Sequence, residues 1–383
     1  MGGKWKKLQQ APVVTTANGD TEAPSSSGRK HTLSLALPGS CIEHCPSAEA
    51  AAAVAAQIAR AAAIFAVDEV VVYEEVPLGG DGSISLGSAT LARVLQYLET
   101  PPFLRASLFP GSVAYPELRC AAALCPSLQT PHHSRSQEWQ SYREGVVMRS
   151  EPDTGSFVDI GYERNAHVEE CLPVGRRVTL YLGSSPSTAF VPAFSETMLK
   201  ARLARPSEPR TQQGTYWGFS VRVATSLSRV LKEPGFKAGY DLSVGTARQG
   251  AVRQVAELVL PTFKHALVVL GGTQELEAIV AGDAALAQAG KGAADLFSLY
   301  LNCCPGQATA SIRSEDAAIL CLAYLHASLL KDGAGTGAGI ACAPSCCPSL
   351  TLIPCSRQTL TLDQSPGAVW GKRGLEQAFG SSV

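Results

Sequence analysis

The run from Leu296 to Glu315 constrains the fold more than any other part of the sequence. It begins with an apolar segment of strand length, 297–301, and breaks at Asn-Cys-Cys-Pro-Gly, where proline lacks a donor and glycine permits positive φ. It ends at Ser314, a favourable N-cap, followed by helical apolar periodicity over 317–330. A strand, an irregular loop and a helix in this order predict a ligand loop at the carboxyl end of a parallel sheet.

The segments upstream favour the same architecture. Residues 31–37 alternate apolar and polar side chains, 47–66 predict a helix with Ser47 as N-cap, and 68–73 form a short buried strand. A strand, helix and strand in succession favour a parallel sheet. Residues 103–140 are expected to be loop-rich. The remaining expected elements are strands over 216–223, 240–244, 265–270 and 297–301, and helices over 88–99, 224–232 and 314–330.

The pattern changes from Arg143 onward. Three short β runs, over 143–148, 156–161 and 176–182, are separated by turn residues. Several short strands in so few residues predict a small β-barrel or sandwich inserted into an α/β domain. A β extension of purely structural use is the alternative interpretation.

Length and charge set further limits. A chain of 383 residues with 45% apolar and 17% charged residues can hold two domains plus tails. It contains no apolar run long enough to span a membrane and no apolar leader, so we expect a soluble intracellular protein. The net charge of −1 argues mildly against a nucleic-acid partner, so any basic surface must be local. The best local candidate is the set Lys200, Arg202, Arg205 and Arg210.

Several site classes are disfavoured. The chain has twelve cysteines but no signal peptide, which argues against a disulfide framework. The tail set Cys342, Cys346, Cys347 and Cys355 contains no Cys-x-x-Cys pair and no histidine, so no metal site is expected. No dinucleotide-binding, P-loop, nucleophile-elbow or zincin motif is present.

Seven blocks in order resemble the SPOUT superfamily of S-adenosylmethionine-dependent RNA methyltransferases, and most closely its eukaryotic and archaeal branch with an OB-like insert. The resemblance runs from about 29 to 330 and includes the strand and glycine pair at 263–272. The blocks are 29–39, 92–99, 131–133, 142–145, 216–218, 239–242 and 302–307.

The resemblance implies an α/β fold: a trefoil-knotted parallel sheet with helices on both faces, interrupted by a small OB-like β-barrel. It also implies a homodimer with the cofactor pockets at the interface, and an RNA-binding face on the barrel. The expected organisation is a disordered lead over 1–28, the methyltransferase domain over 29–140 and 207–331, the insert over 141–206, and a disordered tail over 332–383.

Methyl transfer from a sulfonium needs positioning more than acid chemistry. Backbone groups can hold the adenine, which suits the glycine-rich loops at 245–250, 271–273 and 302–307. The family's first loop usually places arginine beside its final glycine, whereas here Arg248 and Gln249 precede Gly250. If that arginine contacts the cofactor, this departure lowers affinity. The expected S-adenosylmethionine contacts are Gly245, Thr246, Arg248, Gly271, Gly272, Asn302, Pro305, Gly306, Gln307 and Ile312.

Arg313 and Glu315 are the candidate catalytic residues. The arginine could bind phosphate or lower the pKa of a target N–H or 2′-OH, and an ion pair that merely fixes the loop is an equally good interpretation. Adjacent histidines rarely reach one metal, so His132 and His133 favour structural or RNA contacts. Tyr216 and Trp217 are expected in the core. The candidate RNA-binding residues are His132, His133, Arg135, Arg143, Lys200, Arg202 and Arg205.

The resemblance therefore implies an S-adenosylmethionine-dependent RNA methyltransferase that acts on ribosomal RNA, with a uridine base nitrogen favoured over a ribose 2′-OH. The alternative is a catalytically weak or inactive RNA-binding or mitotic scaffold that keeps the fold. The departure at 248–249 and the near-neutral charge favour this alternative. A nuclear or nucleolar location is expected, with spindle or centrosome association as a further expectation from relatives.

Overall fold

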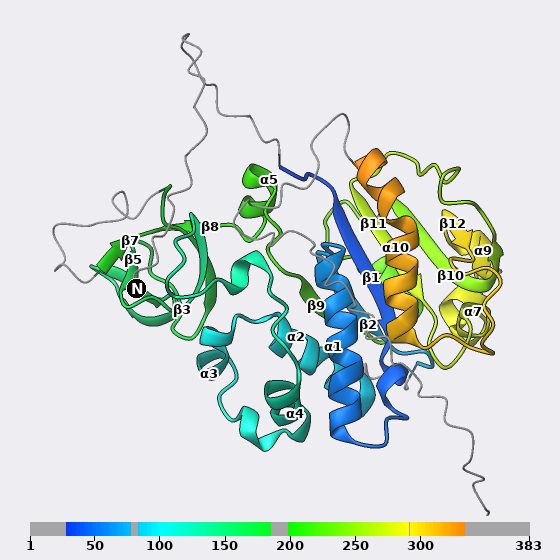
Figure 1. Cartoon of the computed structure of the whole chain (residues 1–383), viewed down its shortest axis with the longest axis horizontal. Helices are drawn as coiled ribbons and strands as arrows, with labels where there is room; N and C mark the ends of the chain where they lie inside the picture. Colours follow the sequence, from blue (N-terminus) through cyan, green and yellow to red (C-terminus); the bar gives the residue numbers. More distant parts are fainter. Residues whose placement is uncertain (1–27, 78–82, 185–197, 291, 334–383) are drawn as a thin grey trace, which may run out of the picture. The chain divides into compact units, whose positions relative to one another are not determined.

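The computed structural model describes residues 28–77, 83–184, 198–290 and 292–333 (Figure 1). The expected N-terminal lead, the Cys342–Cys355 set and nearly all of the expected tail lie outside these residues. The described residues belong to one compact unit, 1–342. Within them, none of the helices has both the length and the apolar character needed to cross a membrane.

A six-stranded parallel sheet forms the centre of the fold. Its order is β12-β10-β11-β1-β2-β9, and Leu35 in β1 aligns with Val268 on one side and Val70 on the other. The parallel sheet predicted from the alternation of strands and helices is confirmed. The strands are β1 (Thr32–Pro38), β2 (Glu69–Tyr73), β9 (Ser220–Ala224), β10 (Leu242–Ala251), β11 (His265–Leu270) and β12 (Leu299–Leu301).

Helices cover both faces of this sheet (Figure 1). Leu33, Leu35 and Leu37 of β1 pack toward the helices on one face, whereas Ala36 packs toward the other, as the two-residue period of a strand requires. The first face holds α1 (Ala48–Ile64), α2 (Leu86–Glu99), α4 (Pro116–Leu124) and α10 (Ser314–Gly333). The second holds α6 (Leu227–Lys232), α7 (Leu276–Gly282), α8 (Ala284–Ala287) and α9 (Ala293–Leu296).

The helix α1 shows how the sequence produces this packing. Ser47 caps it as predicted, since its side chain accepts a hydrogen bond from the Ala50 amide. Its buried face is mostly alanine, including the fully buried Ala52 and Ala55. Small side chains let the helix approach the sheet closely, so an alanine-rich run becomes a buried helix.

A second sheet carries the predicted β insert. Its order is β7-β5-β4-β3-β6-β8, with antiparallel pairs except for the parallel pair β5–β7, and it has its own apolar core around Val158 and Leu180. The several short strands predicted here are confirmed. The strands are β3 (Tyr142–Glu151), β4 (Gly155–Asp159), β5 (Asn165–Val168), β6 (Arg177–Tyr181), β7 (Met198–Lys200) and β8 (Arg202–Ala204).

Other local predictions need correction. The first expected cofactor loop is part of β10, which continues past 244 and shifts register against β12 between Thr246 and Ala251. The loop-rich interpretation of 103–140 missed α4, which is too short for its apolar period to stand out but buries Leu118 against the core. The other short helices are α3 (Arg105–Leu108) and α5 (Glu208–Gln213), with 3-10 turns at Gly39–Ile42, Pro102–Leu104, Ser112–Ala114 and Pro131–His133.

Candidate functional site

The carboxyl ends of β10, β11 and β12 border a cavity of about 280 Å³. These strands are parallel neighbours, so the segments that follow them meet at one edge of the sheet, where ligands bind in open α/β sheets. The first turns of α10 complete the wall through Ala317 and Cys321. The volume lies near the lower end of the range for small-molecule sites, roughly 300 Å³.

Asn302 ties two walls of this cavity together. Its Nδ2 donates to the Arg248 carbonyl oxygen at 2.8 Å, and its Oδ1 accepts from the Cys304 amide at 3.0 Å. One amide side chain therefore sets the spacing between the bulged part of β10 and the segment after β12. The Arg248 side chain itself is exposed at the rim.

The segment that follows Gly271 and Gly272, after β11, is held by the buried carboxylate of Glu75. Glu75 accepts hydrogen bonds from the Thr273 hydroxyl and, at 3.1 Å, from the Gln274 amide. A Cβ on Gly272 would lie 2.2 Å from Cγ of Pro38 and 2.5 Å from Oε1 of Glu75, so this position requires glycine. The sequence analysis missed Glu75, whose one signal was its place just after a buried strand.

The predicted cofactor residues separate into two groups. Gly245, Pro305 and Gly306 do not line the cavity, and their contact with the cofactor stays a prediction. A Cβ on Gly245 would lie 2.3 Å from the Phe297 ring, so this glycine permits packing beneath the strand. Gly306 has φ +76° and forms an exposed turn. Those that do line it are Thr246, Arg248, Gly271, Gly272, Asn302, Gln307 and Ile312.

Three thiols that the sequence analysis did not select also line the cavity: Cys303, Cys304 and Cys321. The pKa of Cys303 is raised by its hydrogen bond with Cys321 and by burial, so it is a neutral thiol at pH 7. A small polarizable side chain of this kind can pack against a ligand without adding charge.

Arg313 and Glu315 lie at the start of α10. The Arg313 side chain is 80% exposed and the Glu315 side chain 5%, with 3.5 Å between Nη1 and Oε1. The ion pair anticipated as one interpretation is therefore present. The helix begins at Ser314 and the Ala317 amide donates to the Arg313 carbonyl, so the N-cap position predicted for Ser314 belongs to Arg313.

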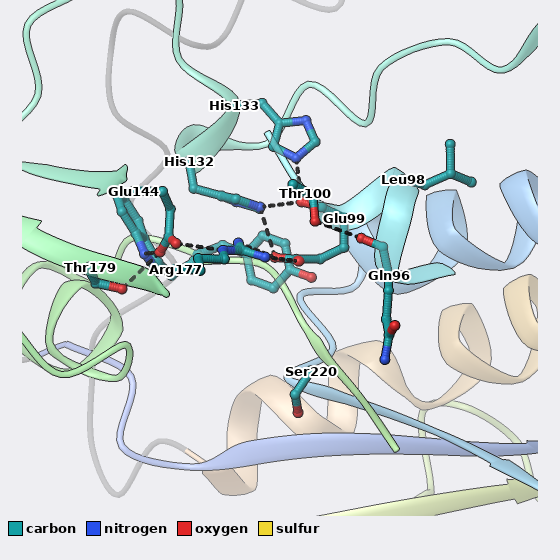
Figure 2. A network of polar contacts seen from close by, with 12 residues as sticks. Gln96, Leu98, Glu99, Thr100, His132, His133, Glu144, Arg177, Thr179 and Ser220 are labelled. Carbon is teal, nitrogen blue, oxygen red and sulfur yellow. Dashed lines mark hydrogen bonds and ion pairs between the residues drawn. The ribbon is translucent and has the colours of Figure 1, made fainter. Parts of the chain in front are cut away.

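A polar network lies between the β insert and the end of α2 (Figure 2). Arg177 in β6 donates to both carboxylate oxygens of Glu99, the last residue of α2, at 2.6 and 3.0 Å. Its Nε donates to Glu144 in β3 at 2.7 Å. Glu144 also accepts from Thr179 at 2.8 Å and from the Trp217 indole at 2.5 Å. The Arg177 guanidinium therefore links Glu99, at the end of α2, to Glu144, in the β insert.

Both histidines of the predicted RNA set contact Glu99 (Figure 2). His132 Nε2 lies 3.0 Å from the Glu99 carbonyl oxygen and 3.1 Å from its Oε1, and His133 Nε2 lies 2.6 Å from the same carbonyl. Burial opposes ionisation of Glu99, but Arg177 and His132 outweigh it and lower its pKa to about 2. Burial and the neighbouring His132 lower the pKa of His133 to about 3, so at pH 7 His133 is neutral and donates.

This arrangement corrects part of the predicted RNA surface. His132 and Arg143 are each 1% exposed, so neither side chain can touch RNA. The Arg143 guanidinium stacks 3.8 Å from the Tyr162 ring centroid and donates to Ser134 Oγ at 2.7 Å. Arg210 also turns inward, 3.3 Å from Asp68. Arg135, Lys200, Arg202 and Arg205 are exposed, and their RNA contacts stay predictions.

The core assignment of Tyr216 is confirmed, since it is buried and its hydroxyl donates to the Val67 carbonyl. Trp217 is half-buried and serves the network around Glu144. Among the residues that the structure describes, no three His, Cys, Asp or Glu side chains gather closely enough to hold a metal ion.

Comparisons with known proteins show which proteins the chain is similar to. Residues 32–325 match a family described as "Putative RNA methyltransferase". The chain is 40% identical over 318 residues to a 28S rRNA (uridine-N(3))-methyltransferase of Homo sapiens, covering 80% of this chain and 81% of that protein. It is 39% identical over 320 residues to the protein of that description from Mus musculus (81% and 80%), and 36% identical over 347 residues to that from Drosophila melanogaster (85% and 68%).

Proposed function

The chain belongs to this family of RNA methyltransferases, and we propose that it transfers a methyl group from S-adenosylmethionine to N3 of a uridine in ribosomal RNA. The observation that carries the proposal is the cavity at the ends of β10, β11 and β12. It joins three segments that are distant in sequence, within a chain 36–40% identical to three proteins described as uridine-N3 methyltransferases. A ribose 2′-OH is the second candidate acceptor.

The residues present fit an adenosine-like cofactor. The cavity combines apolar side chains such as Leu270 and Leu276 with polar groups from Thr246, Asn302 and Gln307. Bare backbone is available at Gly271, where a Cβ would lie 2.9 Å from the Gln274 carbonyl oxygen. Backbone and amide groups would hold the adenosine, and the sulfonium of the bound cofactor supplies an electrophilic methyl group.

We assign the activation of the acceptor nitrogen, N3 of uridine, to the residues at the start of α10. The proton on N3 of uridine must pass to solvent before or during methyl transfer, so that a bond forms between N3 and the methyl carbon while the sulfur–methyl bond breaks. Arg313 is exposed beside Ile312, which lines the cavity. A cation placed there favours the deprotonated uridine and lowers the pKa of N3–H. Glu315, buried and paired with Arg313, orients the guanidinium as a positioning residue.

The proposal extends to fold and assembly. It includes a SPOUT-type trefoil knot, supported by ligand segments at three adjacent strand ends, and an OB-like insert, supported by the second sheet. It includes a homodimer built on α10, supported by exposed Ile319 and Leu320, of which Leu320 lines the cavity. A nuclear or nucleolar location, with spindle or centrosome association, is part of the same proposal.

Calorimetric binding of S-adenosylhomocysteine tests the cofactor site. Ala317→Phe adds a ring at a cavity-lining position of α10, and Ala327→Phe makes the same change at an exposed position of that helix. We expect micromolar binding by the native chain and by Ala327→Phe, and at least about tenfold weaker binding by Ala317→Phe, because the ring occupies ligand volume. Thermal unfolding of both variants establishes that they are folded.

The product provides the second test. Incubation with ribosomal RNA and the methyl donor should yield N3-methyluridine, detected by mass spectrometry of the digested RNA, and Arg313→Ala should lower its rate with little change in cofactor binding. A folded chain that binds no S-adenosylhomocysteine would refute the enzyme proposal and favour the RNA-binding scaffold. Product at a ribose 2′-OH would replace the acceptor and keep the enzyme class.

A further inference from the structure

A second cavity, of about 880 Å³, lies between the β insert and the central sheet. We call it the insert cleft. Its insert side includes Arg176 and Arg205, and its sheet side includes Ser220 at the start of β9. Aromatic rings from Trp217 and Phe236 contribute to the wall. We call the cavity at the carboxyl ends of β10, β11 and β12 the cofactor cavity. The insert cleft shares no lining residue with it, so the two are separate features of the molecule.

The polar network holds the walls of the insert cleft in place. Glu99 on the sheet side and Arg177 on the insert side both line it and are joined by two hydrogen bonds. A Cβ on Gly218, which has φ +78°, would lie 2.3 Å from Glu99 Oε1, so the chain leaving the insert also packs directly on this carboxylate. The two walls of the insert cleft are therefore joined directly to each other.

Charge in the insert cleft is divided between paired and unpaired arginines. Arg177 is neutralised by Glu99 and Glu144, and Arg210 lies 3.3 Å from Asp68 and donates to two backbone carbonyls. The remaining two, Arg176 and Arg205, are exposed, and neither guanidinium makes a hydrogen bond or ion pair to another described residue. The pKa of Glu208 is lowered by its hydrogen bond with Arg202 and by the nearby charge of Arg205, but the N–H donors of the two exposed guanidinium groups remain available to an anion.

Phe236 supplies a flat apolar surface to the same insert cleft. Its ring stacks on His265 with 4.4 Å between centroids and an interplanar angle of 13°. His265 is itself fixed by a 2.7 Å hydrogen bond between its Nδ1 and Thr32 Oγ1. One face of Phe236 is therefore occupied, while the residue also lines the insert cleft. A supported ring of this kind is a stacking platform for a nucleobase.

We propose that the insert cleft binds an unpaired nucleotide of the RNA substrate, several nucleotides away from the methylated uridine. Arg176 and Arg205 contact phosphate, and the base stacks on Phe236. This inference rests on the proposed function, because it assumes an RNA substrate. Two exposed guanidinium groups and an aromatic platform in one cleft match single-stranded RNA, whose bases can leave the stack, better than a duplex, whose bases cannot. An acidic peptide would use the arginines without needing the ring.

Fluorescence anisotropy with the full chain and a labelled ten-nucleotide, uridine-rich single-stranded RNA tests the insert cleft. The double variant Arg176→Ala/Arg205→Ala should bind more weakly and reduce the slope of log K against log salt by about 1.4, because two phosphate contacts are lost. Phe236→Leu should bind at least about fivefold more weakly, because base stacking is lost. Arg164→Ala, which removes an exposed insert arginine outside the insert cleft, should match the native chain.

Different results would overturn the inference. Native affinity in the double variant or in Phe236→Leu would refute it, as would equal affinity for a duplex of the same length. Displacement of the RNA by a deca-glutamate peptide whose binding needs both arginines but not Phe236 would assign the insert cleft to a protein partner instead. Binding of S-adenosylhomocysteine is measured on every variant. Its absence in the native chain refutes the enzyme proposal, and the RNA titration decides the insert cleft separately.

Discussion

Replacing Arg177 with leucine tests whether the buried network holds the insert in place. The change removes the guanidinium that pairs with Glu99 and Glu144 and leaves two buried carboxylates without it. The pKa of Glu99 is about 2 against an ordinary 4.5, despite burial, which opposes ionisation. At about 1.4 kcal/mol per pKa step, the folded environment favours its ionised form by about 3 kcal/mol. Breaking a buried ion pair costs a similar amount, about 3–5 kcal/mol.

We expect Arg177→Leu to lower the free energy of unfolding by about 3 kcal/mol at pH 7, measured by denaturant titration. The stability lost in Arg177→Leu should be smaller at acidic pH, because the ionised form of Glu99 is then less populated. In the native chain Glu99 contributes stability above pH 4.5, and this contribution disappears as pH falls toward 2. In the variant, burial without the cation raises the pKa of Glu99, so protonation relieves the penalty at low pH.

The neighbouring residue provides the control. Arg176→Leu removes an exposed guanidinium that has no partner among the described residues, so stability should change by less than about 0.5 kcal/mol. An Arg177→Leu variant as stable as the native chain would refute the assigned role of the network. Equal losses in the two variants, or a loss that does not vary with pH, would do so as well.

Two further predictions concern the same network and the cofactor cavity. His133→Gln keeps a donor for the Glu99 carbonyl but cannot titrate. The native chain should lose stability as pH falls from about 6.5 to 3. In this range His133 is protonated in the unfolded chain but stays neutral in the folded chain. Denaturant titration across this range should show a smaller loss for the variant, and an unchanged loss contradicts the prediction. Gly272→Ala should weaken S-adenosylhomocysteine binding about tenfold in calorimetry, because its Cβ would meet Pro38 and Glu75. Gly282→Ala, with nothing within 4 Å of its Cβ, is the matched control, and equal affinities would refute the packing argument.

The sequence predicted which end of the sheet carries the cavity, because there the signal was local. The strand, loop and helix over 297–330 are contiguous, so their order alone indicated where Asn302 and Gln307 would lie, and both line the cavity. Glu75 could not be found in this way. Its partners Thr273 and Gln274 are nearly 200 residues away, and only the neighbouring order of β1, β2 and β11 brings them together.

The misassigned RNA residues have a related cause. A sequence shows that His132 and Arg143 are polar, but it does not show that a carboxylate or an aromatic ring encloses them. Glu99 and Arg177 are 78 residues apart, and no helical or strand spacing relates them. The sequence does not distinguish an exposed arginine such as Arg202 from a buried one such as Arg143, because both stand among polar residues in short β segments. The difference lies in the partner that each side chain meets in the folded chain.

The positions of the two cavities constrain how RNA reaches the methyl donor. The cofactor cavity borders the carboxyl ends of β10, β11 and β12, whereas the insert cleft borders Thr32 and Ser220, at the amino ends of β1 and β9. Because the strands are parallel, the two lie at opposite edges of one sheet. Four strand spacings separate β9 from β10, or about 19 Å, and a five-residue strand adds about 17 Å along its axis. A nucleotide in the insert cleft therefore cannot be the one methylated in the same chain. The buried network fixes the insert against α2, so the separation between the two sites is set by the fold. RNA must either cross the sheet edge to reach the cavity or enter the cavity of a second subunit, and an oligonucleotide too short to span this distance should bind without being methylated.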